Sequence, residues 1–159
     1  MNPVPDRETA ARTDDHQALR LWLRLLTCSE LIEREVRARL QRRFDTTLPR
    51  FDLMSQLWRY PAGLKMNELS RHLMVTGGNV TGIVDPLEQQ GLVERLAEPA
   101  DRRAYRVRLT RAGRKAFAEM ARAHEGWIVE LLAGLSRKEQ TDTYRLLARM
   151  KQVTMEAGS

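Results

Sequence analysis

Arginine is concentrated in one short segment of the chain, where guanidinium groups could bind the phosphates of a nucleic acid. From Gly91 to Lys115 eight basic residues stand against three acidic ones, a net charge of +5 within a 159-residue chain of net charge +6. The basic residues are Arg95, Arg102, Arg103, Arg106, Arg108, Arg111, Arg114 and Lys115. Clustered positive charge of this kind is the electrostatic signature of a phosphate-binding surface. The segment therefore predicts a polyanionic partner.

The same segment has the alternation of a β-hairpin. Apolar and charged residues alternate at 92–97 and again at 104–109, and the polar stretch 98–103 between them predicts the turn. A hairpin with this turn would present Asp101, Arg102 and Arg103 at its tip.

Helical periodicity accounts for most of the remaining chain, with Pro49 in the first turn of the second helix and Gly91 as a stop signal. The expected helices are 16–44, 50–60, 68–73, 77–90 after the N-cap Thr76, a long helix from Thr110 that Gly134 breaks, and a last helix after Ser136. The order predicts a mainly α fold with a small β-hairpin. The expected architecture is a winged helix-turn-helix with N- and C-terminal dimerisation helices.

Three regions are expected from this order. Residues 1–15 form a disordered polar tail, 49–110 the winged helix-turn-helix DNA-binding domain, and 16–48 with 111–159 a helical dimerisation region. We expect no secretion signal, because residues 1–15 do not have its basic-then-apolar layout, and no apolar run has membrane-spanning length. The single cysteine, Cys28, precludes an intramolecular disulfide. We expect a cytoplasmic, nucleoid-associated protein.

The stretch LSRHLMVTGGNVTGIVDPLEQQGLV at 69–93, followed by EPADRRAYRVRLTRAG, resembles the multiple-antibiotic-resistance regulator (MarR) family. The resemblance extends from the first long helix to the last. It is most specific in the Asp-x-Arg wing and the Val-x-Leu-Thr strand end. It implies a homodimeric transcription regulator, usually a repressor, that a small molecule releases from a palindromic DNA operator.

The helix after Thr76 is the recognition helix in the family pattern, and its sequence is unusual. Glycines and Pro86 stand where relatives often carry longer or basic side chains, and no Lys or Arg occurs from His72 to Glu94. In the family pattern Arg103 is the wing-tip arginine that enters the minor groove. We therefore expect the wing to supply most of the DNA affinity and DNA shape to supply much of the specificity. The expected DNA contacts are Arg71, Thr76, Gly77, Gly78, Asn79, Val80, Thr81, Asp101, Arg102 and Arg103, with Lys65 as a secondary phosphate contact.

A ligand site is implied by the resemblance alone. In relatives it lies where the first, second and fifth helices meet the DNA-binding lobe, and an aromatic acid or its thioester would suit it. The residues of suitable type are His16, Arg20, Trp22, Met54, Trp58 and His124.

Two alternatives to a ligand-released repressor remain open. One is a redox-switched repressor using Cys28, which we expect instead to be a buried, inert thiol. The other is a constitutive architectural DNA-binding protein. The sequence has no catalytic constellation, no metal site of Cys/His spacing and no cofactor motif, so we expect no enzyme, metal or cofactor.

Overall fold

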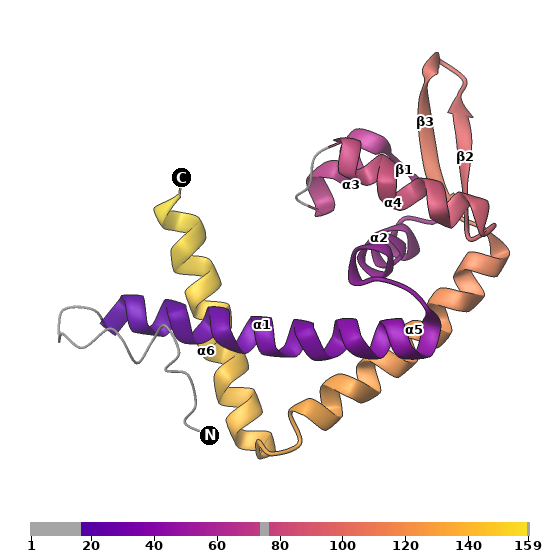
Figure 1. Cartoon of the computed structure of the whole chain (residues 1–159). Coiled ribbons are helices and arrows are strands. Elements are labelled where there is room, and N and C mark those ends of the chain that lie inside the picture. The colour runs from indigo at the N-terminus through magenta and orange to yellow at the C-terminus, as the bar shows by residue number, and fades with distance from the viewer. Residues whose placement is uncertain (1–16, 74–76, 159) are drawn as a thin grey trace. The chain divides into compact units, whose positions relative to one another are not determined.

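The computed structural model describes residues 17–73 and 77–158, with the backbone only for Arg102 (Figure 1). The elements are α1 (Gln17–Phe44), α2 (Leu48–Arg59), β1 (Leu64–Lys65), α3 (Met66–Leu73), α4 (Gly77–Gln89), β2 (Val93–Glu98), β3 (Asp101–Leu109), α5 (Arg111–Leu131) and α6 (Arg137–Ala157). The chain divides into two compact units that meet within α5, between His124 and Glu125. The expected tail at 1–15, and His16 and Thr76, lie outside the described residues.

In the first unit the three helices α2, α3 and α4 precede the β2–β3 hairpin, as predicted. The hairpin belongs to a three-stranded antiparallel sheet of order β1–β3–β2. Val93 pairs with Leu109 at the base of the hairpin, and Glu98 pairs with Asp101 at its tip, across an irregularity at Ala97 and Glu98. The predicted fold class, a mainly α chain with a small β-hairpin, is confirmed.

Two details of the sheet differ from the sequence prediction. Residues 101–103 belong to β3 rather than to the turn, because an exposed antiparallel ribbon tolerates polar side chains. The two-residue strand β1 was not predicted, since two residues carry no periodicity. Its Leu64 pairs with Val107.

Local signals place the helices that carry the hairpin. The Thr47 side chain accepts a hydrogen bond from Arg50 N at 3.4 Å and caps α2, so this helix begins two residues earlier than expected. The chain leaves α4 through Gly91, whose φ of 69° suits a helix C-terminus. Gly113 is required by packing, because a Cβ there would lie 1.8 Å from the carbonyl oxygen of Leu92.

The hydrophobic core of the first unit is formed by residues of α1, α2, α3, α4 and the β2–β3 hairpin. Its fully buried side chains are Leu40, Leu53, Met54, Leu57, Leu69, Val80, Val84, Leu87, Val93 and Val107. Helices α2, α3 and α4 thus pack together with the base of the hairpin, and this packing positions α4 beside β2.

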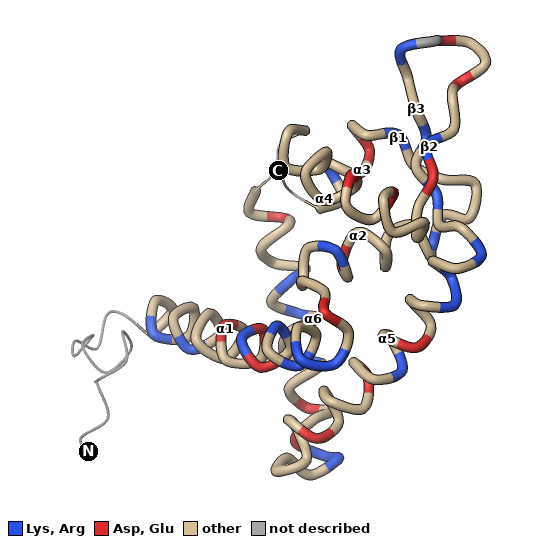
Figure 2. Tube along the Cα trace, turned by 45° about the vertical axis from the view of Figure 1, so that its right-hand side comes forward, with Lys and Arg blue, Asp and Glu red and all other residues tan. Residues whose placement is uncertain are grey.

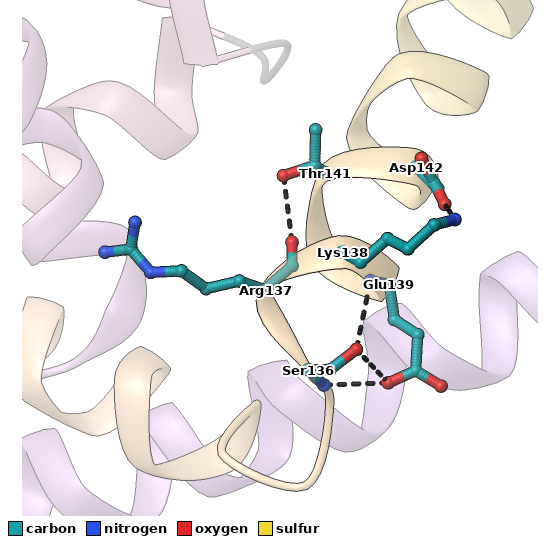
Figure 3. A network of polar contacts seen from close by, with 6 residues as sticks. All are labelled: Ser136, Arg137, Lys138, Glu139, Thr141 and Asp142. Atoms are coloured by element: carbon teal, nitrogen blue, oxygen red, sulfur yellow. Dashed lines mark hydrogen bonds and ion pairs between the residues drawn. The ribbon is translucent and has the colours of Figure 1, made fainter.

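The second unit contains the end of α5 and α6. Ser136 caps α6 with the predicted capping box: its hydroxyl accepts a hydrogen bond from Glu139 N at 3.3 Å, and the Glu139 carboxylate accepts one from Ser136 N at 2.7 Å (Figure 3). These bonds to Ser136 lower the pKa of Glu139. Helix α6 has no buried residue. Among the described residues, no helix is both long and apolar enough to cross a membrane.

Candidate nucleic-acid interface

The exposed residues of α4 include three glycines. Gly77, Gly78 and Gly82 are exposed, and a Cβ added at any of the three would meet nothing within 4 Å. The fold therefore has room for larger side chains here. Bare backbone on this face permits close approach of a phosphate or a groove edge.

Asn79 and Thr81 are the exposed polar side chains among the expected α4 contacts. The Thr81 hydroxyl donates to the carbonyl oxygen of Gly77 at 3.3 Å, so its donor is engaged within the helix. Asn79 forms no side-chain hydrogen bond with another described residue, so its amide could meet a base edge.

The prediction that Val80 faces DNA is wrong. Its side chain is fully buried, together with Val84 and Leu87 on the same face of α4. The spacing of four and then three residues was a readable signal of a core-facing stripe.

The arginines along the hairpin are largely engaged in ion pairs within the chain. Arg106 pairs with Glu98 and donates to the carbonyl oxygen of Gly63 at 3.0 Å, and Arg108 pairs with Glu94 at 2.6 Å. Figure 2 shows acidic and basic residues interspersed along β2 and β3. The net charge of the segment therefore overstates the positive charge that is available to DNA.

Arg95 connects the wing to the recognition helix. From β2 it forms ion pairs with Asp85 and Glu88, both on α4. The hydrogen bond to Asp85 is the main cause that raises the pKa of Arg95. One guanidinium thus joins β2 to α4, a role that sequence reasoning missed.

The tip of the wing is organised for an exposed arginine. The Asp101 carboxylate accepts a hydrogen bond from Arg103 N at 3.0 Å, so Asp101 holds the turn. Arg103 is exposed and forms no ion pair within the described part of the chain. The side chain of Arg102 lies outside the description.

Arg71 lies on the outer surface of α3. Its Nε donates to the carbonyl oxygen of Asn67 at 3.4 Å, and the rest of its guanidinium forms no ion pair with a described residue. Lys65 is half-buried in β1.

An aromatic cluster joins α2 and α5 at part of the expected ligand site. The ring of Phe117 lies 5.4 Å from Trp58 and 5.5 Å from Phe51, and His124 lies 5.0 Å from Phe51. Arg114 stacks over Trp58 at 4.7 Å, and Trp58 remains 39% exposed. The structure therefore brings Trp58 and His124 into one cluster of rings, through Phe117 and Phe51.

Other residues expected at that site lie elsewhere. Met54 is fully buried in the core. Arg20 and Trp22 are exposed near the N-terminus of α1, about 20 Å along the helix from Val36, its first buried residue. Within one chain they do not join the aromatic cluster.

One carboxyl group beside the cluster has a perturbed pKa. Partial burial and then the negative charge of Glu33 raise the pKa of Asp52, while His124 and Arg37 act in the opposite direction. The group therefore lies where α1, α2 and α5 approach one another.

Cys28 is exposed in the chain, so the expectation of a buried thiol is wrong. Position 28 falls on the outer side of a long helix whose buried residues, Val36 and Leu40, occur only in its C-terminal half. No group of three or more His, Cys, Asp or Glu side chains within residues 17–73 and 77–158 could hold a metal ion.

Known proteins share this arrangement. The MarR family model matches residues 46–105. A MarR family transcriptional regulator from Silicibacter pomeroyi is 32% identical, with a TM-score of 0.75 over 90% of this chain and 99% of that one. Wild-type MarR from E. coli is 26% identical, with a TM-score of 0.72 over 80% and 94%.

A relative of described function is also similar along most of its length. The transcriptional activatory protein BadR of Rhodopseudomonas palustris is 28% identical over 149 residues, 90% of this chain and 83% of the relative. The chain belongs to the MarR family of winged-helix, DNA-binding transcription regulators.

Proposed function

We propose that this regulator is a homodimeric repressor that a small molecule releases from a palindromic operator. The observation that carries the dimer is α6, which has no buried residue although it is rich in large apolar side chains. Those exposed on α6 are Tyr144, Leu146, Leu147, Val153 and Met155, and those on α1 are Leu19, Leu21, Trp22 and Leu31. Apolar surface of this extent favours burial against a second copy.

In this proposal the two functions belong to different parts of the chain. Residues 49–110 bind DNA, and 16–48 with 111–159 form the dimer. A two-fold dimer presents two copies of α4 and two wings, and half-sites about one helical turn apart then produce a palindromic operator. We propose Arg71, Asn79, Thr81, Asp101, Arg103 and the three α4 glycines as contacts, with Thr76 and Arg102 added from the sequence.

The dimer is tested by light scattering after size-exclusion chromatography. The wild-type chain should have twice its mass of 18.4 kDa. Leu146→Glu/Met155→Glu should have the single-chain mass, because carboxylates would replace the apolar contact. Arg145→Glu/Lys151→Glu, which adds the same carboxylates at exposed polar positions of α6, should stay dimeric. A monomeric wild-type protein, or equal losses in both variants, would contradict the proposal.

The sign of regulation needs its own measurement, since the relative BadR is described as an activatory protein. An operator is first selected from random DNA with the purified protein. Transcription in vitro from a promoter that overlaps this site should fall when the protein is added. A rise would assign the chain to activators.

The small molecule is proposed to bind the aromatic cluster of α2 and α5, with an aromatic acid or its thioester as its class. Trp58 and His124 are the expected contacts. A bound effector should lower the affinity for the selected DNA in the wild type and have less effect in Trp58→Leu. Full DNA affinity with every compound of the class would favour the constitutive alternative.

The exposed Cys28 favours a second candidate, a redox-switched repressor. In that case peroxide would lower DNA affinity in the wild type and leave Cys28→Ser unchanged. We expect no such difference, because the aromatic cluster rather than the thiol is the proposed switch.

A further inference from the structure

A cavity of about 300 Å3 opens within the first unit, where residues from the ends of α1 and α4 face the first half of α5. Its volume lies at the lower end of the range for small-molecule sites. Asp45 follows α1, Gln90 follows α4, and Glu119 belongs to α5; all three line the cavity. It shares no residue with the aromatic cluster of α2 and α5, so it is separate from the proposed effector site.

Two carboxylates of the lining are available to a ligand. Glu119 is exposed and forms no ion pair or side-chain hydrogen bond with a described residue. Asp45 accepts a hydrogen bond from Gln41 Nε2 through Oδ1 at 2.7 Å, which leaves its Oδ2 for a ligand. None of the described lining residues is Lys or Arg. The lining therefore carries two negative charges and no positive one.

The backbone adds to the negative potential of the cavity. Helices α1 and α4 end at Phe44 and Gln89, and the residue that follows each end lines the cavity. The carbonyl end of a helix carries a partial charge of about −0.5, which favours a cation. Arg43, in the last turn of α1, lies over the Phe44 ring at 5.4 Å and is not part of the lining. Two helix ends thus reinforce the carboxylates.

Thr46 is an independent indication of a ligand. It lines the cavity although the residue is only 8% exposed. Its hydroxyl has no hydrogen-bond partner among the described residues, and no described side-chain N or O atom is both unpartnered and closed to solvent. The hydroxyl is therefore open to one of the two cavities that Thr46 borders, and only the cavity with Glu119 has carboxylates in its described lining. Buried polar groups normally have a partner, and a ligand here would supply one.

The remaining wall of the cavity is apolar. It is formed by Phe44, Met54, Leu92, Ala116 and Met120. Methionine side chains adapt their shape to an apolar group that packs against them. A bare metal ion would leave this wall unused, whereas an aliphatic chain would cover it.

We propose that this cavity binds a primary ammonium group carried by a short aliphatic chain. The ammonium has three N–H donors, and it donates them to the Asp45 and Glu119 carboxylates and the Thr46 hydroxyl. The chain packs against Met54 and Met120. The net charge of the protein is +6, so a cation is attracted by this local arrangement and not by the protein as a whole. The site does not rest on the proposed repressor or on its effector.

The site is tested by titrating the DNA-free, 15N-labelled protein with hexylammonium at constant ionic strength, followed by its backbone amide signals in NMR. The largest shifts should occur at 44–46, 90–92 and 116–120. Three controls each lack one part of the recognition. 1-Hexanol has the chain without charge, methylammonium has the charge without the chain, and hexyltrimethylammonium has both but no N–H donor. Hexylammonium should bind at least about fivefold more tightly than each of them.

Variants locate the ammonium among the three acceptors. Asp45→Asn and Glu119→Gln should each weaken hexylammonium binding about tenfold, because each removes one charge-assisted hydrogen bond. Asparagine also tolerates the φ of 48° at position 45. Thr46→Val keeps the branched shape without the hydroxyl and should weaken binding about threefold. Glu125→Gln makes the same change of charge on α5 outside the lining and should leave the affinity unchanged.

The amide spectrum of each variant shows whether it is folded. If Thr46→Val does not fold, the variants of the two exposed carboxylates still decide the question. The proposal is overturned if hexylammonium does not bind at millimolar concentration, if 1-hexanol or hexyltrimethylammonium binds as tightly, or if Glu119→Gln loses no more affinity than Glu125→Gln. Because no DNA is present, failure of this site leaves the proposed repressor intact, and failure of the repressor leaves this site intact.

Discussion

Helix α4 and the β2–β3 hairpin, the two elements that we propose to bind DNA, differ in the side chains that they offer to it. Helix α4 has no Lys or Arg and exposes three glycines, whereas the hairpin carries arginines along its whole length. Yet most of the described hairpin arginines are neutralised within the chain, whereas Arg103 at the tip is exposed and forms no ion pair with a described residue.

This difference shows that the net charge of a segment does not tell how many of its arginines are available to bind DNA. At the base of the hairpin the arginines are structural. Arg108 pairs with Glu94 across the two strands, and Arg95 pairs with Asp85 on α4. In the proposed interface the arginine at the tip contacts DNA and α4 contributes shape. The two regions would then act as one surface, and Arg95 is the side chain that connects them.

The largest expected effect is the loss of the arginine at the wing tip. Arg103→Ala should weaken binding to the selected operator roughly 10- to 100-fold and reduce its salt dependence, because a charge-assisted contact disappears. Asn79→Ala, on α4, should cost less at physiological salt. Fluorescence anisotropy with labelled DNA measures both, and equal or reversed losses would remove the division of labour between wing and helix.

Much of the fold follows from local signals that the sequence displays. Pro49, Gly91 and the Ser136–Glu139 pair mark helix ends, and the alternation at 92–97 and 104–109 marks the hairpin. These predictions are correct because caps and periodicity act over a few residues.

The site was less predictable, for physical reasons. Arg95 meets Asp85 and Glu88 only because tertiary packing sets α4 against β2, and no local pattern encodes that pairing. The exposure of Cys28 likewise depends on packing along α1. The burial of Val80 was different, because its spacing from Val84 and Leu87 was visible in the sequence.

A smaller loss of DNA affinity is expected when the ion pairs between Arg95 and α4 are removed. Arg95→Met keeps the length of the side chain but leaves Asp85 and Glu88 unpaired near DNA. We expect about tenfold weaker binding from repulsion and misalignment. Arg108→Met is the matched control, because its ion pair with Glu94 lies within the hairpin. If both variants lose the same affinity, the wing and α4 are not coupled through Arg95.

The smallest expected effect separates stability from binding on α4 itself. Gly82→Ala should stabilise the protein by about 0.5–1 kcal/mol, because alanine favours a helix and the new Cβ meets open space. It should also weaken DNA binding a few-fold by keeping the backbone away from the groove. Gly126→Ala on α5 also places its Cβ in open space, so it should gain similar stability without a change in DNA affinity. Thermal melting and anisotropy measure the two quantities. If Gly82→Ala binds DNA as tightly as the wild type, close approach of the α4 backbone is not part of recognition, and the wing must supply even more of it.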